Sequence, residues 1–157
     1  MPPLIQSDPG VSSTGETLAQ LEEAIQQAAN QYFRLVILAG VPGSGKTAAL
    51  QSVAQKAGCE VVNVNLELSK KMLELTRMQR SRQVERLLKD VIAAAPGDVA
   101  VLDNLEILFD TGLEVEPLRL LQVSSRNRTV VASWSGTYVG GTLTQARPNS
   151  TRQVSIA

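Results

Sequence analysis

The segment Gly40-Val41-Pro42-Gly43-Ser44-Gly45-Lys46-Thr47 has the spacing G-x-x-x-x-G-K-[ST], and it decides the fold expected for the rest of the chain. It follows the apolar run Leu35–Ala39, which is typical of a parallel strand buried on both faces, and it opens a helical pattern. Its glycines let the backbone turn with N–H groups pointing inward, where a bulkier residue would clash with a phosphate. The sequence therefore predicts a phosphate-binding loop, and a glycine-rich turn without a ligand is the alternative.

The residues of this loop have separate predicted roles. Backbone N–H groups and the N-terminus of the following helix are expected to hold the α- and β-phosphates of a nucleotide. Lys46 would reach the β- and γ-phosphates, and Thr47 would bind Mg²⁺ through its hydroxyl. The predicted ligand is ATP or GTP with Mg²⁺. The predicted nucleotide-binding residues are Gly40, Pro42, Gly43, Ser44, Gly45, Lys46, Thr47 and Ala48.

A second motif lies downstream, where the apolar residues 99–102 end in Asp103. This pattern is typical of a Walker B strand, whose aspartate binds Mg²⁺ directly or through water. The alternative is an aspartate that caps the next helix. Because a complete phosphate-binding loop precedes it, we interpret Asp103 and Thr47 as the metal ligands.

Candidate catalytic residues follow the predicted strands. Additional-strand ATPases use a polar residue at the tip of the strand after Walker B to sense the γ-phosphate. Ser133 or Ser135 is a candidate for this role. The alternative is a turn residue, because serines are common at strand ends. These ATPases often have a glutamate directly after the Walker B aspartate, but this chain has Asn104, which orients water and cannot accept its proton. We expect slow hydrolysis, with Glu106 preferred over Glu67 as the substitute. The predicted catalytic residues are Lys46, Asp103, Asn104, Glu106 and Ser133.

Hydrophobic periodicity predicts alternating helices and strands, hence a three-layer α/β fold with a parallel sheet and no helical lid domain. The expected strands are 35–39, 61–66, 99–102 and 129–134, with a weaker one near Leu143. Ser13 and Glu16 have the spacing of a capping box, which predicts the start of the first helix. Ser69 is expected to cap a later helical piece that breaks within 76–82. A further helix is expected to begin near Pro117. Gly136, Gly140 and Gly141 are expected to interrupt the chain. The predicted organisation is a flexible arm (1–12), one P-loop NTPase domain (13–146) and a polar tail (147–157).

Composition narrows the chemistry. The chain has 157 residues, one cysteine and no histidine, so an internal disulfide, histidine catalysis and zinc sites are excluded. It lacks an apolar stretch long enough for a transmembrane helix and a signal-peptide pattern at its N-terminus. A cytoplasmic protein that does not contact membranes is expected.

The net charge is zero, but the sequence contains one predominantly basic segment and one acidic segment. Basic residues dominate Lys70–Lys89, whereas 90–116 contains acidic residues and neither Lys nor Arg. A solvated helix face, a nucleic-acid or partner surface, and complementarity between subunits all fit this pattern. We expect nucleotide-dependent self-association, or docking on a larger ATPase, in which a neighbour supplies an arginine to the γ-phosphate. The candidate arginines are Arg77, Arg80, Arg82, Arg126 and Arg128.

Three segments in so short a chain, Gly40–Thr47, Asp103–Phe109 and Ser133–Gly136, resemble the BrxF family, the small P-loop proteins of type 3 BREX (bacteriophage exclusion) systems. The resemblance covers roughly residues 15–146. It implies a bacterial cytoplasmic NTPase that works beside other defence proteins, among them a large ATPase, a DNA methyltransferase and a phosphatase-like protein. The chain is also similar to an additional-strand, AAA+ core without its lid, so the lid's second sensor arginine has no counterpart.

Three functions fit these observations. The first is a Mg²⁺-dependent ATPase or nucleotide switch of slow intrinsic turnover in a defence assembly. The second is a small-molecule or nucleotide kinase, in which Arg77, Arg80 and Arg82 would act as lid arginines, although an acceptor-binding carboxylate motif is not evident. The third is a nucleotide-gated scaffold with negligible hydrolysis, suggested by Asn104.

Overall fold

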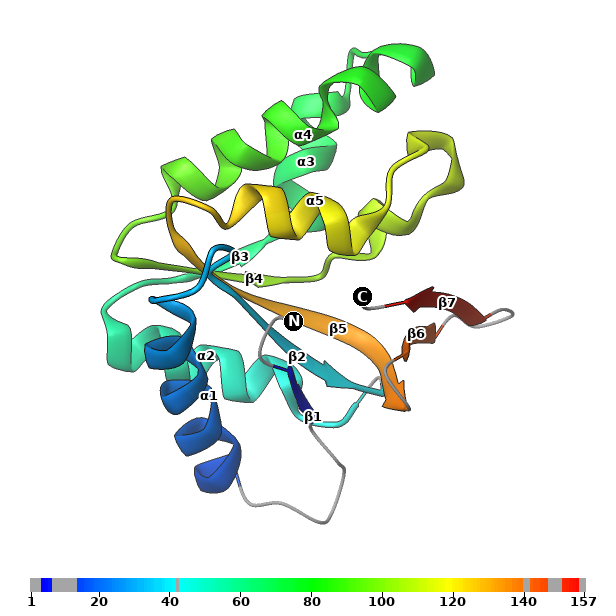
Figure 1. The fold of residues 1–157 in the computed structure, drawn as a ribbon. Helices are drawn as coiled ribbons and strands as arrows, with labels where there is room; N and C mark the ends of the chain where they lie inside the picture. The colour runs from blue at the N-terminus through cyan, green and yellow to red at the C-terminus, as the bar shows by residue number, and fades with distance from the viewer. Residues whose placement is uncertain (1–3, 7–13, 42, 140–141, 147–150, 156–157) are drawn as a thin grey trace.

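A computed structural model of the chain describes residues 4–6, 14–41, 43–139, 142–146 and 151–155. Its parallel strands lie in the order β1 (Leu4–Gln6), β2 (Leu35–Gly40), β5 (Thr129–Val139), β4 (Val99–Asp103) and β3 (Val61–Asn63). Helices α1 (Thr14–Ala28) and α2 (Lys46–Ala57) cover one face of this sheet, and α3 (Val64–Met72), α4 (Arg77–Ala94) and α5 (Pro117–Ser124) cover the other (Figure 1). The predicted three-layer α/β fold is confirmed.

The sheet separates two hydrophobic cores. All residues of β2 are buried, and successive residues point to opposite faces, so Leu35 and Ile37 pack in the core under α3, α4 and α5. Val36 and Leu38 pack in the core under α1 and α2. An unbroken apolar run is what a strand covered on both faces requires, which is why this strand was predictable from sequence.

The strand that follows β4 in the chain is inserted between β2 and β4 in the sheet. Leu38 on β2 is paired with Ser133 on β5, and Leu102 on β4 is paired with Ala132. Parallel strands end at the same edge of a sheet, so this order brings Ser133 beside Asp103. The predicted additional-strand arrangement is therefore present.

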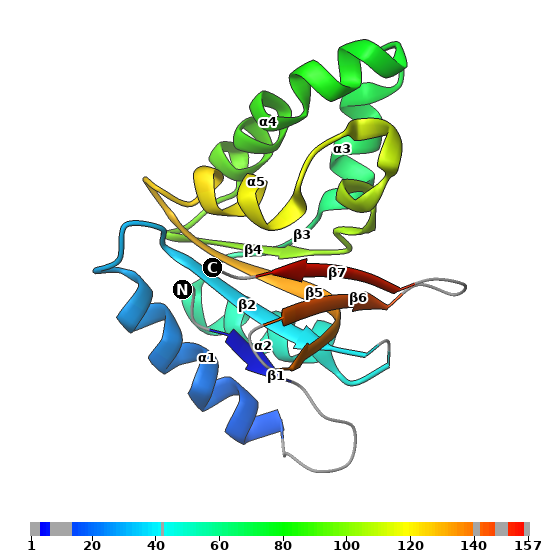
Figure 2. The ribbon, with the colours of Figure 1, turned by 45° about the vertical axis from the view of Figure 1, so that its right-hand side comes forward.

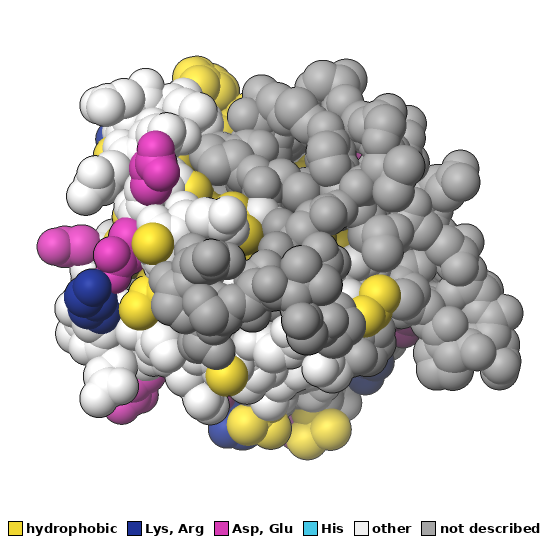
Figure 3. Space-filling view, turned by 90° about the horizontal axis from the view of Figure 1, so that it is seen from below, with side chains coloured by type: hydrophobic (Ala, Val, Ile, Leu, Met, Phe, Trp, Pro, Cys, Tyr) yellow, Lys and Arg dark blue, Asp and Glu magenta, His cyan; other side chains and the backbone are white. Residues whose placement is uncertain are grey.

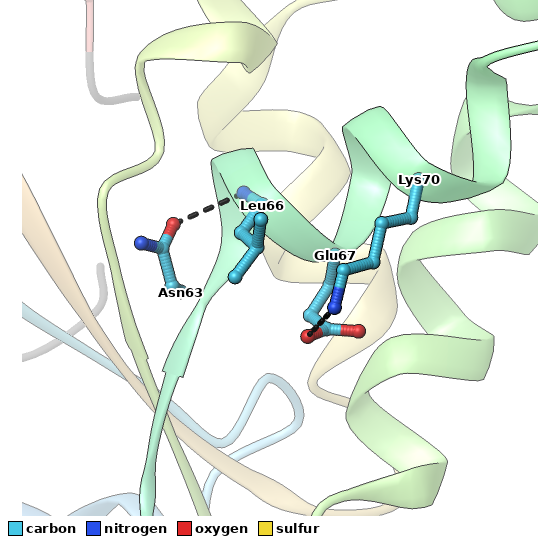
Figure 4. Close-up of polar contacts among 4 residues, drawn as sticks. All are labelled: Asn63, Leu66, Glu67 and Lys70. Carbon is cyan, nitrogen blue, oxygen red and sulfur yellow. Dashed lines mark hydrogen bonds and ion pairs between the residues drawn. The ribbon is translucent and has the colours of Figure 1, made fainter.

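The second parallel strand is shorter than predicted. The expected strand 61–66 ends at Asn63, and α3 begins at Val64, because the Asn63 side chain accepts a hydrogen bond from the Leu66 N–H at 3.1 Å (Figure 4). This N-cap converts the second half of the apolar run into a helix. Ser69, predicted as a helix cap, lies inside α3 instead.

The predicted break within 76–82 is also displaced. The chain turns between Leu73 and Thr76, and α4 already begins at Arg77. Thr76 and Gln79 form a capping box, in which the Thr76 hydroxyl accepts from the Gln79 N–H at 3.2 Å and the Gln79 side chain accepts from the Thr76 N–H at 2.9 Å. Arg77, Arg80 and Arg82 therefore lie on the first turns of a helix.

Both ends of the described chain add strands to the sheet. Residues 4–6 fall within the expected flexible arm but form β1, parallel to β2. Gly136 does not interrupt β5, which continues to Val139 and pairs antiparallel with β6 (Thr142–Ala146), the strand predicted near Leu143. β7 (Thr151–Ser155), in the expected polar tail, pairs with β6 (Figure 2). Ser13, Gly140 and Gly141 lie outside the described residues.

The described part of one face of the molecule carries side chains of mixed character. Seen from below, hydrophobic side chains form small separate groups, with acidic and basic side chains between them (Figure 3). Leu73 and Met78, on either side of the turn between α3 and α4, are the most exposed large aliphatic side chains in the described part of the chain. Within that part, none of the helices combines the length and hydrophobicity needed to cross a membrane.

The cap of α3 yields a test of this fold. Asn63→Ala removes the acceptor for the Leu66 N–H and should lower the free energy of unfolding by about 1 kcal/mol. Asn63→Ser keeps a capping oxygen and should lose less. Urea unfolding of the two variants and the wild type measures both effects. Equal stability of the alanine and serine variants would contradict the assignment of this cap.

Candidate functional site

The phosphate-binding loop connects the end of β2 to the start of α2. Gly43 and Gly45 have φ angles of +83° and +90°, a conformation that favours glycine. A Cβ atom built on either residue would have no atom of the described residues within 4 Å, apart from its own chain neighbours. Glycine is therefore required by the backbone turn, and the space in front of the loop is open to a ligand. Pro42 lies outside the described residues.

Lys46 lies across this loop with its side chain buried. Its ammonium donates hydrogen bonds to the Gly40 carbonyl at 2.8 Å and the Val41 carbonyl at 2.9 Å. Burial lowers the pKa of Lys46, and the negative charges of Asp103 and Glu106 oppose this shift. A polyphosphate beside the ammonium would add negative charge and favour its protonated form. Affinity for such a ligand should therefore fall as the pH rises through the pKa of Lys46.

The Asp103 carboxylate joins three elements of the fold. The Thr47 hydroxyl, on the first turn of α2, donates to Asp103 Oδ2 at 2.8 Å. The Ser133 hydroxyl, on β5, donates to Asp103 Oδ1 at 2.6 Å. Asp103 and Ser133 are both buried. Each carboxylate oxygen of Asp103 thus accepts a hydrogen bond from a hydroxyl group, and neither caps the helical turn that follows.

This arrangement fits Mg²⁺ held jointly with a phosphate. The hydroxyl of Thr47 and the carboxylate of Asp103 are hard oxygen ligands, which Mg²⁺ prefers. Within the described ranges, no group of three or more Asp, Glu, Cys or His side chains is placed to hold a metal alone. A cation here would rely on phosphate oxygens and water for its remaining ligands, as Mg²⁺ usually does in nucleotide sites.

Asn65, at the start of α3, is a site residue that the sequence did not reveal. Its side-chain amide donates to Glu106 Oε2 at 3.1 Å, and its side-chain oxygen accepts from the Ile107 N–H at 2.7 Å. Its backbone N–H donates to the Asn104 carbonyl at 2.9 Å. Asn65 thereby fixes the turn that carries both predicted water-positioning residues. Asn65 falls inside the strand expected at 61–66, so no local sequence pattern marks it as a site residue.

Asn104 and Glu106 are exposed beside the buried aspartate. Asn104 has a φ of +55°, in the left-handed region that asparagine tolerates better than glutamate. The negative charge of Glu106 reaches Lys46. By contrast, Glu67 lies on α3 and forms an ion pair with Lys70 at 3.7 Å (Figure 4). The structure thus brings Glu106, but not Glu67, to the loop.

The two candidate serines on β5 differ in their surroundings. Ser133 contacts Asp103, whereas Ser135 is half-buried and paired with the last residue of β2, Gly40. Between them, Trp134 is buried on the opposite face and packs edge-to-face on Phe109, with ring centroids 4.8 Å apart. Since β5 continues to Val139, neither serine is at a strand tip.

Two of the candidate arginines lie at the other end of the sheet. The Arg128 guanidinium donates to carbonyls of Ile92, Pro96 and Gly97, where α4 ends. It caps that helix, so it is not free to enter a neighbouring site. Arg126 lies over the Tyr32 ring, 4.4 Å from its centroid. Both precede β5, at the edge opposite the phosphate-binding loop.

Comparison with known proteins agrees with this geometry. Residues 36–126 match the model of the "ATPase family associated with various cellular activities (AAA)", whose members generally bind ATP with Mg²⁺ and hydrolyse it. The match runs from β2 through the loop and Asp103 to the end of α5, and Ser133 lies beyond it. Searches of curated proteins and of solved structures returned no match. The match covers more than half of the sequence, and the chain therefore belongs to the AAA family of ATPases.

Proposed function

We propose that the chain is a Mg²⁺-dependent ATPase or nucleotide switch of slow intrinsic turnover that acts in a bacterial BREX defence assembly. The observation that carries the nucleotide part is the pair of hydrogen bonds from Thr47 and Ser133 to Asp103, next to an open loop. The defence part, with a cytoplasmic location, is supported by the resemblance of three sequence segments to the BrxF family.

Nucleotide binding would exchange the partners of two side chains. The Lys46 ammonium would leave the Gly40 and Val41 carbonyls for phosphate oxygens, which form stronger, charge-assisted hydrogen bonds. The Thr47 hydroxyl would turn from Asp103 to the metal, whereas Ser133 would keep its hydrogen bond and hold the carboxylate in place. Mg²⁺, when bound, would neutralise part of the negative charge on the phosphates.

Slow turnover follows from the residues beyond β4. Asn104 cannot accept a proton from the attacking water, so Glu106 is the candidate base. Its carboxylate already accepts a hydrogen bond from the Asn65 side-chain amide, so this contact competes with the positioning of a water. The same two observations support the scaffold alternative, in which nucleotide is bound and hardly hydrolysed.

Assembly is the second part of the proposal. Of the seven cations in Lys70–Lys89, Lys70, Arg86 and Lys89 are already in ion pairs with acidic side chains on their own helices. Lys71, Arg77 and Arg82 remain for a partner, which supports contact with the acidic segment 90–116 of another copy, a larger BREX ATPase or nucleic acid. Among the candidate arginines, Arg77, Arg80 and Arg82 are better placed for a neighbour than Arg128.

Lys46→Ala should weaken ATP–Mg²⁺ binding roughly 10- to 150-fold, because a charge-assisted hydrogen bond to phosphate is lost. Titration calorimetry measures the affinity. Lys56→Ala is the matched control, since Lys56 lies on the same helix and forms an exposed ion pair with Glu22 at 2.8 Å. Equal affinities of Lys46→Ala and wild type would overturn the site.

The same pair of variants tests the defence role. In the bacterium that encodes the chain, chromosomal Lys46→Ala should abolish protection against phages, measured as plating efficiency, and Lys56→Ala should retain it. Unchanged protection in the Lys46→Ala strain, with both proteins present at wild-type levels, would refute the BREX assignment and leave nucleotide binding untouched.

The isolated protein should hydrolyse ATP below about 1 s⁻¹, the low end of typical turnover. Glu106→Gln should reduce that rate further, because the amide keeps the shape of the side chain and loses the base. Glu67→Gln is the control, because Glu67 pairs with Lys70 away from the loop. Phosphate release assays decide: fast turnover that is insensitive to Glu106→Gln would contradict the mechanism.

Self-association should appear with ATP–Mg²⁺ and weaken with salt, because screening reduces attraction between opposite charges. Sedimentation velocity across a salt series measures it. Arg82→Glu should lower the salt concentration at which half of the assembly has dissociated. A monomer under every condition, even with the BREX partners present, would count against the assembly part.

A further inference from the structure

An open cavity of about 520 Å³ lies between the start of α4 and the turn that follows β4. Its volume is within the range of small-molecule sites. None of its lining residues belongs to the phosphate-binding loop, so it is a separate site. They are Leu75, Arg77, Arg80, Asp110, Gly112 and Leu113. We propose that this cavity binds a phosphate ester through Arg77 and Arg80.

The two arginines line the same cavity. Arg80 donates from Nε to the Leu75 carbonyl at 3.1 Å, which fixes the side chain and leaves its terminal NH₂ groups for a ligand. Within the described residues, Arg77 has no hydrogen bond or ion pair. Paired guanidinium groups match the oxygens of a phosphate with bidentate geometry.

Gly112 allows Arg77 to occupy this position. A Cβ atom built on Gly112 would lie 2.9 Å from Nε and 3.2 Å from Nη2 of Arg77. The Arg77 guanidinium therefore lies directly against the glycine backbone, where any side chain would displace it. The φ of Gly112 is not positive, so the turn itself does not demand glycine. The same Cβ would lie 3.2 Å from Asp110 Oδ1, so a side chain here would crowd both polar groups of the cavity.

Asp110 favours a ligand that carries a hydrogen-bond donor in addition to its phosphate. Its Oδ1 accepts from the Gly112 N–H at 2.8 Å, which leaves Oδ2 to accept from a ligand hydroxyl or amine. Two guanidiniums against one carboxylate give the cavity net positive charge, and the N-terminus of the 18-residue α4 adds to it. Leu75 and Leu113 supply an apolar wall. These features together suit a phosphate ester carrying hydroxyl or amine groups.

The phosphate can come from a free small molecule or from the end of a nucleic acid, and the test separates these sources. Lys46→Ala protein is used throughout, so the result does not depend on the nucleotide site. Ribose 5-phosphate and a 5′-phosphorylated single-stranded tetranucleotide are titrated separately by calorimetry. Binding of at least one probe is expected, and the probe that binds more tightly identifies the source.

Adding Arg77→Gln and Arg80→Gln should weaken that binding at least roughly tenfold, the size expected for losing charge-assisted hydrogen bonds. Gly112→Ala should weaken it as well, because the added methyl group would displace the ends of the Arg77 and Asp110 side chains in the cavity. Arg82→Gln, on the same helix but outside the cavity, is the control. Circular dichroism verifies folding of each variant. The proposal is overturned if neither probe binds, or if Arg82→Gln weakens binding as much as the double variant.

Discussion

The Asp103 carboxylate is the group on which the rest of the site depends. Removing an ionised carboxylate from water is costly unless hydrogen-bond donors replace the water, and here Thr47 and Ser133 each donate to one oxygen. One donor comes from the helix after the loop and the other from the inserted strand. The carboxylate therefore holds α2, β4 and β5 in one arrangement, and it is satisfied only if β5 lies between β2 and β4.

Much of this arrangement could be predicted because it follows from strong local patterns. The loop spacing, the unbroken apolar run 35–39 and the strand ending in Asp103 each allow few interpretations, and their order along the chain implies a parallel sheet. Ser133 and Ser135 both fit the sensor position in the sequence, and Ser133 is the one predicted to be catalytic. Only the pairing of Leu102 with Ala132 decides that Ser133 contacts Asp103.

The missed features depend on side chains that bond to nearby backbone. Asn63 ends a strand that hydrophobicity alone would continue to Leu66, and Thr76 starts a helix where the apolar period is weak. Asn65 contacts residues that are distant in sequence, so no local pattern reports it. Arg128 was a candidate for a neighbouring subunit's site, because a surface arginine and a helix-capping arginine cannot be told apart in the sequence.

The short strand β1 has a further consequence for handling the protein. It covers the hydrogen-bonding edge of β2, a six-residue strand made only of apolar residues and glycine. An uncovered edge of that composition is a template for pairing with strands of other molecules, which leads to aggregation. Residues 4–6 thus cover this edge of β2, and an expression fusion or proteolytic cut that disturbs them would expose it to pairing with other molecules.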